Sequence, residues 1–543
     1  MNADTHVERE NRLVLAHIYT ATGALVIGAL FGMLQSFSRA EWIRMPAAFD
    51  YYRMLTAHGV LMALVFTTFF ICGFAEFVTY RAMPRQRSLV IGWIGFWLML
   101  AGTLAATVAI VTGNASVLYT FYAPLKAHPA FYLGATGLIV GTWFVGADIL
   151  IEVARFRKDR PGERIPLVVH GAACTFIMWL IATAGVAAEM IFFLIPWSLG
   201  WTPAVNVMMT RLLFWYFGHP LVYFWIMGAY LIWYNVVPTL YKGTIFSDAL
   251  TRLAFLLLLI LSTPVGIHHE FVEPGISAGW KWLFTMTTYG VVIPSIMTAF
   301  AVFASFEIAA RRNGHRGVWG VVRSLPWSNP VFTGPALGMV LFILGGLGGI
   351  INASYSLDTL VHNTMWVVGH FHVTVGGPVA LSFVGAAYWL VPALTGRRLW
   401  APKLALAQTY LWFFGMAVMS VSMHWAGLLG SPRRTDDVSY FGAAAANAWM
   451  PEMWGAAVGG IVLFISIVLF ASVALGTRFV DRKQTTEVTF AAVEGGALPA
   501  PASFDRLGAW GLTAVVLAIG AYAGPVVELL SQHTFGAPGM RTW

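Results

Sequence analysis

Long apolar segments alternate with short polar or charged breaks along the whole chain. Thirteen apolar segments are long enough to cross a membrane, at residues 13–37, 55–80, 90–113, 129–153, 165–197, 206–240, 249–269, 280–310, 331–351, 362–394, 404–429, 454–475 and 507–530. A helix needs roughly 20 residues to cross about 30 Å of hydrocarbon. The pattern therefore predicts an all-α polytopic membrane protein.

The breaks divide the chain into a twelve-helix body and one further helix. We expect the body at residues 1–480 and a polar linker at residues 481–506, which contains the string Pro-Ala-Pro-Ala. Residues 507–543 contain the thirteenth predicted helix and a short tail. We see no internal repeat and no separate soluble domain.

Lysine and arginine are concentrated in the loops that follow the even-numbered predicted helices. The loop after the fourth helix, for example, carries Arg155, Arg157, Lys158, Arg160 and Arg164. Because cytoplasmic loops are enriched in these residues, the pattern places the N-terminus in the cytoplasm and the C-terminus outside a prokaryotic inner membrane.

The composition agrees with a membrane protein, since 58% of the residues are hydrophobic and only 10% are charged. The topology accounts for the formal net charge of +8, so nucleic acid is not an expected partner. Cys72 and Cys174 lie inside apolar segments without a CxxC motif, which is typical of buried thiols.

Six histidines occur in four short strings at the edges of predicted helices. The strings are Ala57-His58-Gly59, Gly218-His219-Pro220, Ile267-His268-His269 and Gly369-His370-Phe371-His372. With the topology above, all six imidazoles fall in the outer half of the membrane. One such histidine is usually a hydrogen-bonded interfacial residue, as we expect for the chain's other histidines except His362. Six at one depth of an apolar bundle indicate metal ligands.

Helical phase separates these histidines into two centres. At about 100° per residue, His370 and His372 point to nearly opposite faces of one helix. His268 and His269, at a helix end, can turn toward one ion that His219 also approaches, and imidazole binds copper or iron. Such a three-histidine site, facing a metal held by His370, suits dioxygen. His58 and His372 would hold a separate six-coordinate iron for electron transfer.

Hydroxyl side chains follow His219 toward the cytoplasm. Tyr223 lies one turn after it, and Tyr230 and Tyr234 continue the same helical face. Ser295 and Thr298 lie one turn apart on the eighth predicted helix. These residues form either a surface that packs against a neighbouring helix or a path for protons.

Charged residues also gather on the predicted outer side. Asp358 and His362 precede the tenth helix, and Arg433 and Arg434 follow the eleventh. Paired arginines need anionic partners, which heme propionates would supply. The alternative is a solvated loop balanced by nearby aspartates, Asp436 and Asp437.

The sequence resembles subunit I of the heme-copper oxygen reductases from about Arg12 through the last helix. Three strings are similar to its B family, which includes the ba-type cytochrome c oxidases. They are Trp-Tyr-Phe-Gly-His-Pro-Leu-Val-Tyr (215–223), Ser-Thr-Pro-Val-Gly-Ile-His-His (262–269) and Val-His-Asn-Thr-Met-Trp-Val-Val-Gly-His-Phe-His (361–372).

The resemblance implies two hemes and one copper ion. His58 and His372 would be the axial ligands of a low-spin heme, expected to be b-type. His370 would bind a high-spin heme, expected to be a-type with b-type as the alternative. The remaining implied roles are copper binding by His219, His268 and His269, a covalent bond from Tyr223 to His219, and contacts to heme propionates by Asp358, His362, Arg433 and Arg434.

Two departures from related sequences concern proton transfer. Leu221 stands where the A family has a proton-conducting glutamate, which leaves the single path through Tyr223, Tyr230, Tyr234, Ser295 and Thr298. Ala301 stands where the B family can have a threonine, and water would bridge that gap.

The resemblance implies a terminal oxidase that reduces dioxygen to water, takes protons from the cytoplasm and pumps others outward. One alternative is nitric oxide reductase, which has iron in place of copper and a glutamate near the histidine of the sixth helix. Another is a transporter that uses histidines as a proton relay, which would show inverted repeats.

Electron delivery requires a partner, because the chain has no Cys/His/Met cluster for a binuclear copper site. We expect a subunit II that carries this site and accepts electrons from cytochrome c or another small electron-transfer protein. The alternative is direct binding of a quinol. A small single-helix subunit is a further expected partner.

Overall fold

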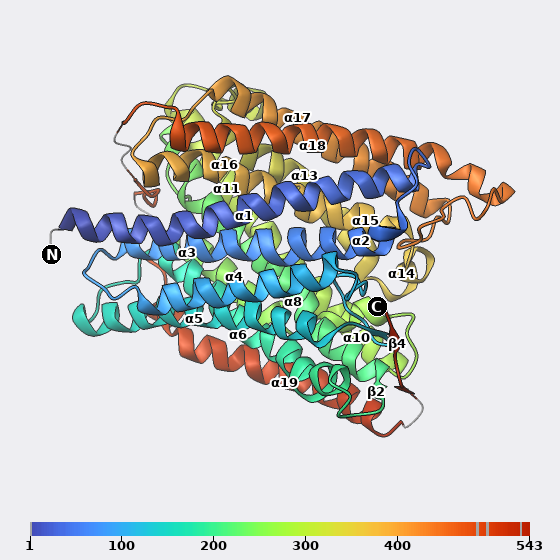
Figure 1. Ribbon diagram of the computed structural model, residues 1–543. Helices are drawn as coiled ribbons and strands as arrows, with labels where there is room; N and C mark the ends of the chain where they lie inside the picture. The colour runs from blue at the N-terminus through green and yellow to red at the C-terminus, as the bar shows by residue number, and fades with distance from the viewer. Residues whose placement is uncertain (1–2, 485–487, 496–498, 533–534, 543) are drawn as a thin grey trace.

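The computed structural model describes residues 3–484, 488–495, 499–532 and 535–542. It is a bundle of long helices that run side by side (Figure 1). The first half contains α1 (Ala3–Arg39), α2 (Tyr51–Gly59), α3 (Thr67–Ala82), α4 (Val90–Val111), α5 (Pro129–Asp159), α6 (Leu167–Glu189), α7 (Ile195–Ser198), α8 (Val207–Asn235) and α9 (Asp248–Leu261). The second half contains α10 (Ala278–Gly290), α11 (Val292–Arg312), α12 (Gly317–Ser324), α13 (Pro330–Ala353), α14 (Tyr355–Val361), α15 (Met365–Phe371), α16 (Pro378–Thr395), α17 (Pro402–Leu428), α18 (Met450–Phe479) and α19 (Leu507–Leu530).

Three π-helical segments join helices into longer spans. They are η2 (Val60–Phe66) between α2 and α3, η3 (Met190–Leu194) between α6 and α7, and η6 (His372–Gly376) between α15 and α16. The 3-10 segments are η1 (Ala47–Phe49), η4 (Val237–Tyr241), η5 (Gly266–Glu270), η7 (Ala444–Ala448) and η8 (Ala502–Asp505). Two of the π-helical segments directly adjoin predicted ligands, since η2 begins two residues after His58 and η6 begins at His372. Single π turns often occur at functional sites.

Within the described residues, twelve helical spans are long and apolar enough to cross a membrane, and the last of them is α19. They correspond to twelve of the thirteen predicted segments. The prediction of a full span at residues 249–269 is wrong in length, because α9 has only 14 residues and ends at Leu261. Pro264 lacks a backbone N–H, so the helix does not continue, and the chain reaches His268 through irregular backbone and η5.

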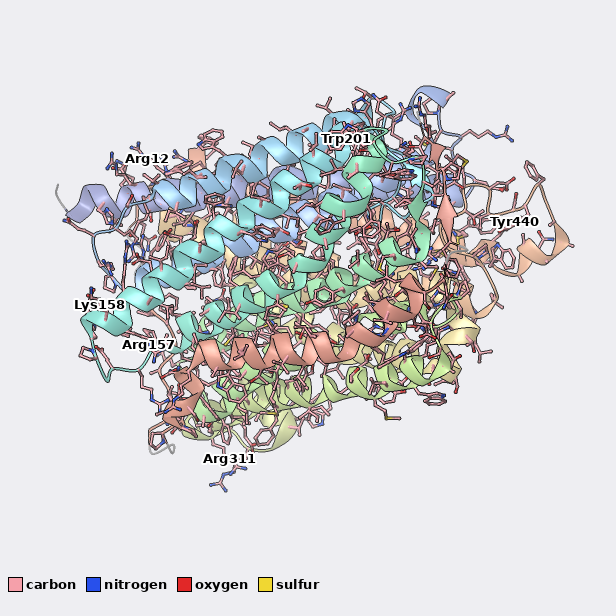
Figure 2. All side chains as sticks on the ribbon, turned by 90° about the horizontal axis from the view of Figure 1, so that it is seen from below. Arg12, Arg157, Lys158, Trp201, Arg311 and Tyr440 are labelled. Atoms are coloured by element: carbon pink, nitrogen blue, oxygen red, sulfur yellow. The ribbon has the colours of Figure 1, made fainter. Side chains whose placement is uncertain are left out.

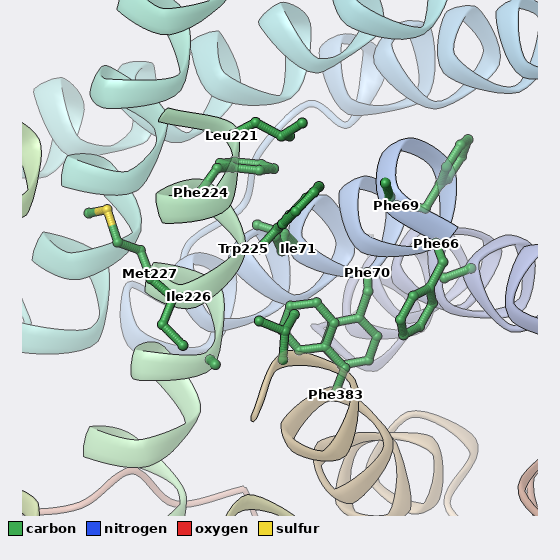
Figure 3. Close-up of a cluster of buried hydrophobic side chains, with 14 of the residues drawn as sticks. Phe66, Phe69, Phe70, Ile71, Leu221, Phe224, Trp225, Ile226, Met227 and Phe383 are labelled. Carbon is green, nitrogen blue, oxygen red and sulfur yellow. The ribbon is translucent and has the colours of Figure 1, made fainter. Parts of the chain in front are cut away.

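The interior is packed with aromatic rings and, where helices approach most closely, with glycine. Phe70 of α3 stacks on Phe383 of α16 with ring centroids 4.3 Å apart, within the cluster shown in Figure 3. Between α4 and α5, a Cβ at Gly102 would overlap the carbonyl oxygen of Gly134. Small residues at such positions let membrane helices pack backbone to backbone.

The two ends of the bundle differ in composition. Arg12, Arg157, Lys158 and Arg311 lie toward the same end, whereas Trp201 and Tyr440 lie toward the other (Figure 2). At the second end, residues after α19 form two short pairings: β4 (Met540–Arg541) pairs with β1 (Leu125–Lys126), and β3 (Gly536–Ala537) pairs with β2 (Val205–Asn206).

The described part of the predicted linker contacts the end of the bundle toward which Arg12, Arg157, Lys158 and Arg311 lie (Figure 2). Asp505 pairs with Arg252 at 2.9 Å and lies 3.4 Å from the ring of His170. Burial alone would raise the pKa of Asp505, but His170, Arg252 and Arg164 together hold that pKa below its usual value. The carboxylate therefore fixes the chain just before α19 begins. Residues 485–487 and 496–498 of the predicted linker lie outside the described residues.

Candidate metal centre

Three histidines from α8 and η5 converge on one point. Their ligand atoms, from His219, His268 and His269, all lie within 4.8 Å of one another. Nδ1 of His219 lies 2.9 Å from Nε2 of His269, and the ring centroids of His219 and His268 are 4.1 Å apart. Imidazole nitrogens at this spacing suit one copper or iron ion.

The surroundings orient each ring of this cluster. Nδ1–H of His268 donates to the carbonyl oxygen of Val265 and lies 3.1 Å from the Thr288 hydroxyl, which leaves Nε2 for a metal. The indole of Trp215 stacks on His269 with centroids 3.7 Å apart and planes within 8°. The buried Nε2 of His219 has no hydrogen-bond partner among the described residues. The donor set therefore fits a three-coordinate site that accepts a further ligand.

His58 and His372 form a separate pair. Their rings are nearly parallel, at 7°, with centroids 6.2 Å apart. Each Nδ1–H donates to a backbone carbonyl at 2.8 Å, His58 to Gly28 and His372 to Val368, so both Nε2 atoms are available. Two metal–nitrogen bonds of about 2 Å each leave room for one ion between such rings.

His370 points to a different neighbour from His372, as the helical phase predicts. Its ring lies against α13, where a Cβ at Gly348 would be 3.0 Å from Nδ1 and a Cβ at Gly349 would be 3.4 Å from Cε1. Glycine at both positions gives this imidazole room. The two rings therefore face different helices, His372 facing α2 and His370 facing α13.

The tyrosines on α8 are all close to further hydroxyls. The ring of Tyr223 lies 4.9 Å from that of His219, centroid to centroid. The hydroxyls of Tyr230 and Tyr234 are buried and make no hydrogen bond within the described residues. Ser295 and Thr298 face Tyr230, and Thr298 also faces Tyr234. Buried polar groups in this state are usually bridged by water.

Two hydroxyls near this path were not predicted from the sequence. Thr251 of α9 also faces Tyr234. Ser305, one turn beyond Ala301, is buried and accepts a hydrogen bond from the Phe246 backbone at 2.9 Å. Neither stands out in the sequence, because each becomes relevant only through packing between distant helices.

The four predicted charged residues lie near the end that carries the histidines. His362 donates to Asp358 at 2.7 Å, and burial raises the pKa of that carboxyl. Arg433 donates to Asn363 Oδ1 at 2.7 Å. Burial, and then the neighbouring Arg434, lower the pKa of Arg433 to about 10. Two adjacent, partly buried guanidinium groups therefore favour an anionic ligand.

The predicted alternative for these arginines involved Asp436 and Asp437. Asp437 instead accepts hydrogen bonds from Ser439 and from the Phe441 backbone, and Asp436 accepts one from Ser38. Neither aspartate forms an ion pair with Arg433 or Arg434 in the part of the chain that the structure describes. The geometry thus favours an anion other than these aspartates.

Two of the remaining histidines, which we expected to be hydrogen-bonded interfacial residues, are fully buried in the protein. His17 is fully buried with its Nε2 3.6 Å from Glu76, and His170 is fully buried beside Asp505. Long helices on every side cover both rings, which the local sequence does not reveal. His533 lies outside the described residues.

Comparison with known proteins supports one family. Residues 12–462 match the family described as "Cytochrome C and Quinol oxidase polypeptide I". The chain is 40% identical to cytochrome c oxidase subunit 1 of Thermus thermophilus, over 98% of this chain and 97% of that one. It is 27% identical to a probable cytochrome c oxidase subunit 1-beta of Nocardia farcinica, over 78% and 72%. A solved heme-copper terminal oxidase matches with a TM-score of 0.93 and 35% identity, over 98% of this chain and 95% of that one.

Proposed function

Because the chain belongs to the cytochrome c and quinol oxidase polypeptide I family, it is the catalytic subunit of a heme-copper terminal oxidase, and we propose that its six histidines divide between three metal ions. His58 and His372 hold the low-spin heme iron. His370 holds the high-spin heme iron, and His219, His268 and His269 hold copper. The observation that carries this proposal is the convergence of the last three beside Tyr223.

The bound metals supply electrons and an open coordination position at which dioxygen is reduced. The protein contributes orientation, since carbonyl groups fix the Nδ1 atoms of His58 and His372 and Trp215 fixes the ring of His269. Tyr223 contributes a proton and an electron from its hydroxyl group. Its covalent bond to His219 would replace a ring C–H of Tyr223 and the N–H of Nε2, a loss of two electrons and two protons for which dioxygen is the oxidant. Nε2 is the atom that otherwise has no hydrogen-bond partner among the described residues.

Protons reach the site through the hydroxyls of Tyr234, Tyr230 and Tyr223, with Ser295 and Thr298 alongside. The unsatisfied hydroxyls of Tyr230 and Tyr234 support this path because they provide sites for connecting water. Ala301 interrupts the row of hydroxyls on α11, and water bridges from Thr298 toward Ser305. The subunit also pumps protons across the membrane.

Asp358, His362, Arg433 and Arg434 bind heme propionates. The partly exposed guanidinium group of Arg433 supports this assignment, as do the hydrogen bonds that Asp437 accepts from Ser439 and the Phe441 backbone. The low-spin heme is b-type and the high-spin heme is a-type. The body, linker and last helix occupy residues 1–480, 481–506 and 507–543.

The end that carries Arg12, Lys158 and Arg311 faces the cytoplasm of a bacterial inner membrane, so the N-terminus is inside and the C-terminus outside. A subunit II with a binuclear copper site delivers electrons from cytochrome c, and a small single-helix subunit completes the complex. Leu221 and Val222 follow His219 along the chain, where the nitric oxide reductase alternative calls for a glutamate.

The decisive experiment is a reduced-minus-oxidised spectrum of the purified complex, with heme extraction and metal analysis. We expect two hemes and one copper ion per copy of this chain, beyond the copper of subunit II. Non-heme iron without copper would instead indicate nitric oxide reductase. A protein without heme would contradict the assignment altogether.

A further inference from the structure

The last helix of the chain touches the backbone that carries two of the proposed copper ligands. In α19, the Tyr522 hydroxyl oxygen accepts a hydrogen bond from the backbone N–H of Gly266 at 2.8 Å. Gly266 opens η5, two residues before His268. Tyr522 itself is buried against Tyr216 of α8 and Phe284 of α10, with ring centroids 4.8 and 5.2 Å away.

This contact satisfies a backbone group that regular structure leaves unpaired. α9 ends at Leu261, and the residues between it and η5 follow neither a helix nor a strand. The N–H of Gly266 is buried, and the Tyr522 hydroxyl is its partner. A buried N–H without a partner destabilises the structure, so the hydroxyl favours this particular backbone path.

The backbone at Gly266 is also closely packed, so this segment has no space in which to shift. A Cβ at this position would overlap both the Trp215 carbonyl oxygen and the Tyr522 hydroxyl oxygen. Trp215 of α8 is the same residue whose indole stacks on His269. The segment before the two histidines is therefore enclosed between α8 on one side and α19 on the other.

We infer that Tyr522 is a positioning residue for the copper site: its hydrogen bond to Gly266 fixes the 3-10 segment that aims His268 and His269 at His219. This inference rests on the proposed copper function of those three histidines. Groups that orient metal ligands typically contribute 10–100-fold to metal affinity. A helix remote in sequence from the ligands thus contributes to copper retention.

The test uses the purified complex and a Tyr522→Phe variant, which keeps the ring and removes only the hydroxyl. The matched control is Trp510→Phe, because Trp510 makes a hydrogen bond to Ser503 at the other end of the same helix. The measurements are copper bound per heme during titration with a copper chelator, the low-spin heme band and the midpoint of thermal denaturation.

We expect Tyr522→Phe to lose copper at about tenfold or more lower chelator concentration than wild type, with the low-spin heme band unchanged and only a small decrease in the thermal midpoint of the copper-loaded complex. Trp510→Phe should behave as wild type. Equal copper retention in Tyr522→Phe and wild type would overturn the inference, as would parallel loss of copper, heme and thermal stability. Absence of chain-bound copper from wild type would contradict the proposed function instead.

Discussion

The two histidine sites are built in different ways, although they lie in the same half of the bundle. The pair of His58 and His372 comes from helices that continue through both ligands, and each ring is fixed by a backbone carbonyl. The cluster of His219, His268 and His269 joins one helix to an irregular segment, and its rings contact one another. The orientation of the pair depends on α1, α2 and the helix that carries His372, whereas the orientation of the cluster depends on α8, α10 and α19.

This difference indicates which structural changes each site can undergo without losing its geometry. Glycines 28 and 32 of α1 allow close approach to His58, since a Cβ at Gly32 would lie 2.6 Å from Cε1 of that ring. The pair therefore keeps its geometry as long as α1, α2 and α15 remain packed. The cluster brings three ring nitrogens together in the buried interior, where their lone pairs repel one another. One metal ion bound by all three nitrogens removes this repulsion.

The largest expected effect comes from removing one ligand at each site. His219→Ala should lower oxygen reduction by more than about a hundredfold, beyond the usual effect of losing a supporting group, and should leave the low-spin heme band intact. His372→Ala should remove that band and leave the copper of this chain bound. Spectra and metal analysis of both variants measure this. Loss of both centres in either variant would mean that the two sites are not independent.

Tyr223→Phe should have the next largest effect, confined to the cluster. We expect turnover to fall by about 10²–10⁴-fold, the range that a positioned acid contributes, with copper and both hemes retained. Oxygen consumption measures the change, and the exposed Tyr440 provides the control substitution Tyr440→Phe. Full turnover in Tyr223→Phe would exclude the role given to this hydroxyl.

Removal of copper should distinguish the sites without mutation. If the ion is present at about a hundred times its Kd, its removal costs about 3 kcal/mol of stability, because it binds the folded state. We expect a lower midpoint of thermal denaturation after chelation and an unchanged low-spin heme band. Recovery of the midpoint on adding copper is the control. A band that shifts with copper content would show that the pair depends on the cluster.

The smallest expected effect tests the contact between α10 and the cluster. Thr288→Val removes a hydroxyl 3.1 Å from Nδ1 of His268, and one hydrogen bond contributes about 1 kcal/mol, or roughly fivefold in copper affinity. Thr285→Val on the same helix is the control, since that hydroxyl binds only the Lys281 carbonyl. Chelator titration compares the two. An equal copper affinity in both variants would contradict a role for the Thr288 hydroxyl and would mean that the Val265 carbonyl alone orients the His268 ring.

Sequence reasoning was most effective where local geometry decides the outcome. Apolar length predicted thirteen spans, of which the described residues contain twelve, and the 100° rotation per residue predicted that His370 and His372 have different neighbours. The same reasoning failed at residues 249–269, because hydropathy does not register that Pro264 stops a helix in the middle of an apolar segment.

The supporting contacts were beyond the reach of sequence reasoning for a different reason. Tyr522 and Gly266 are separated by 256 residues, and no periodicity relates them. Thr251, Thr288 and Ser305 are single hydroxyls on apolar helices, a common pattern with no chemical signature. Their importance arises only when the helices pack, so it depends on tertiary structure.

The separation between Tyr522 and Gly266 has a consequence for how the protein is made. Chains grow at about 5–20 residues per second, so 256 residues take about ten to fifty seconds. During that interval, His268 and His269 exist in a growing chain without the helix that completes their backbone support. With the proposed copper function, the site is thus complete only after α19 has been synthesised, and copper insertion follows that step.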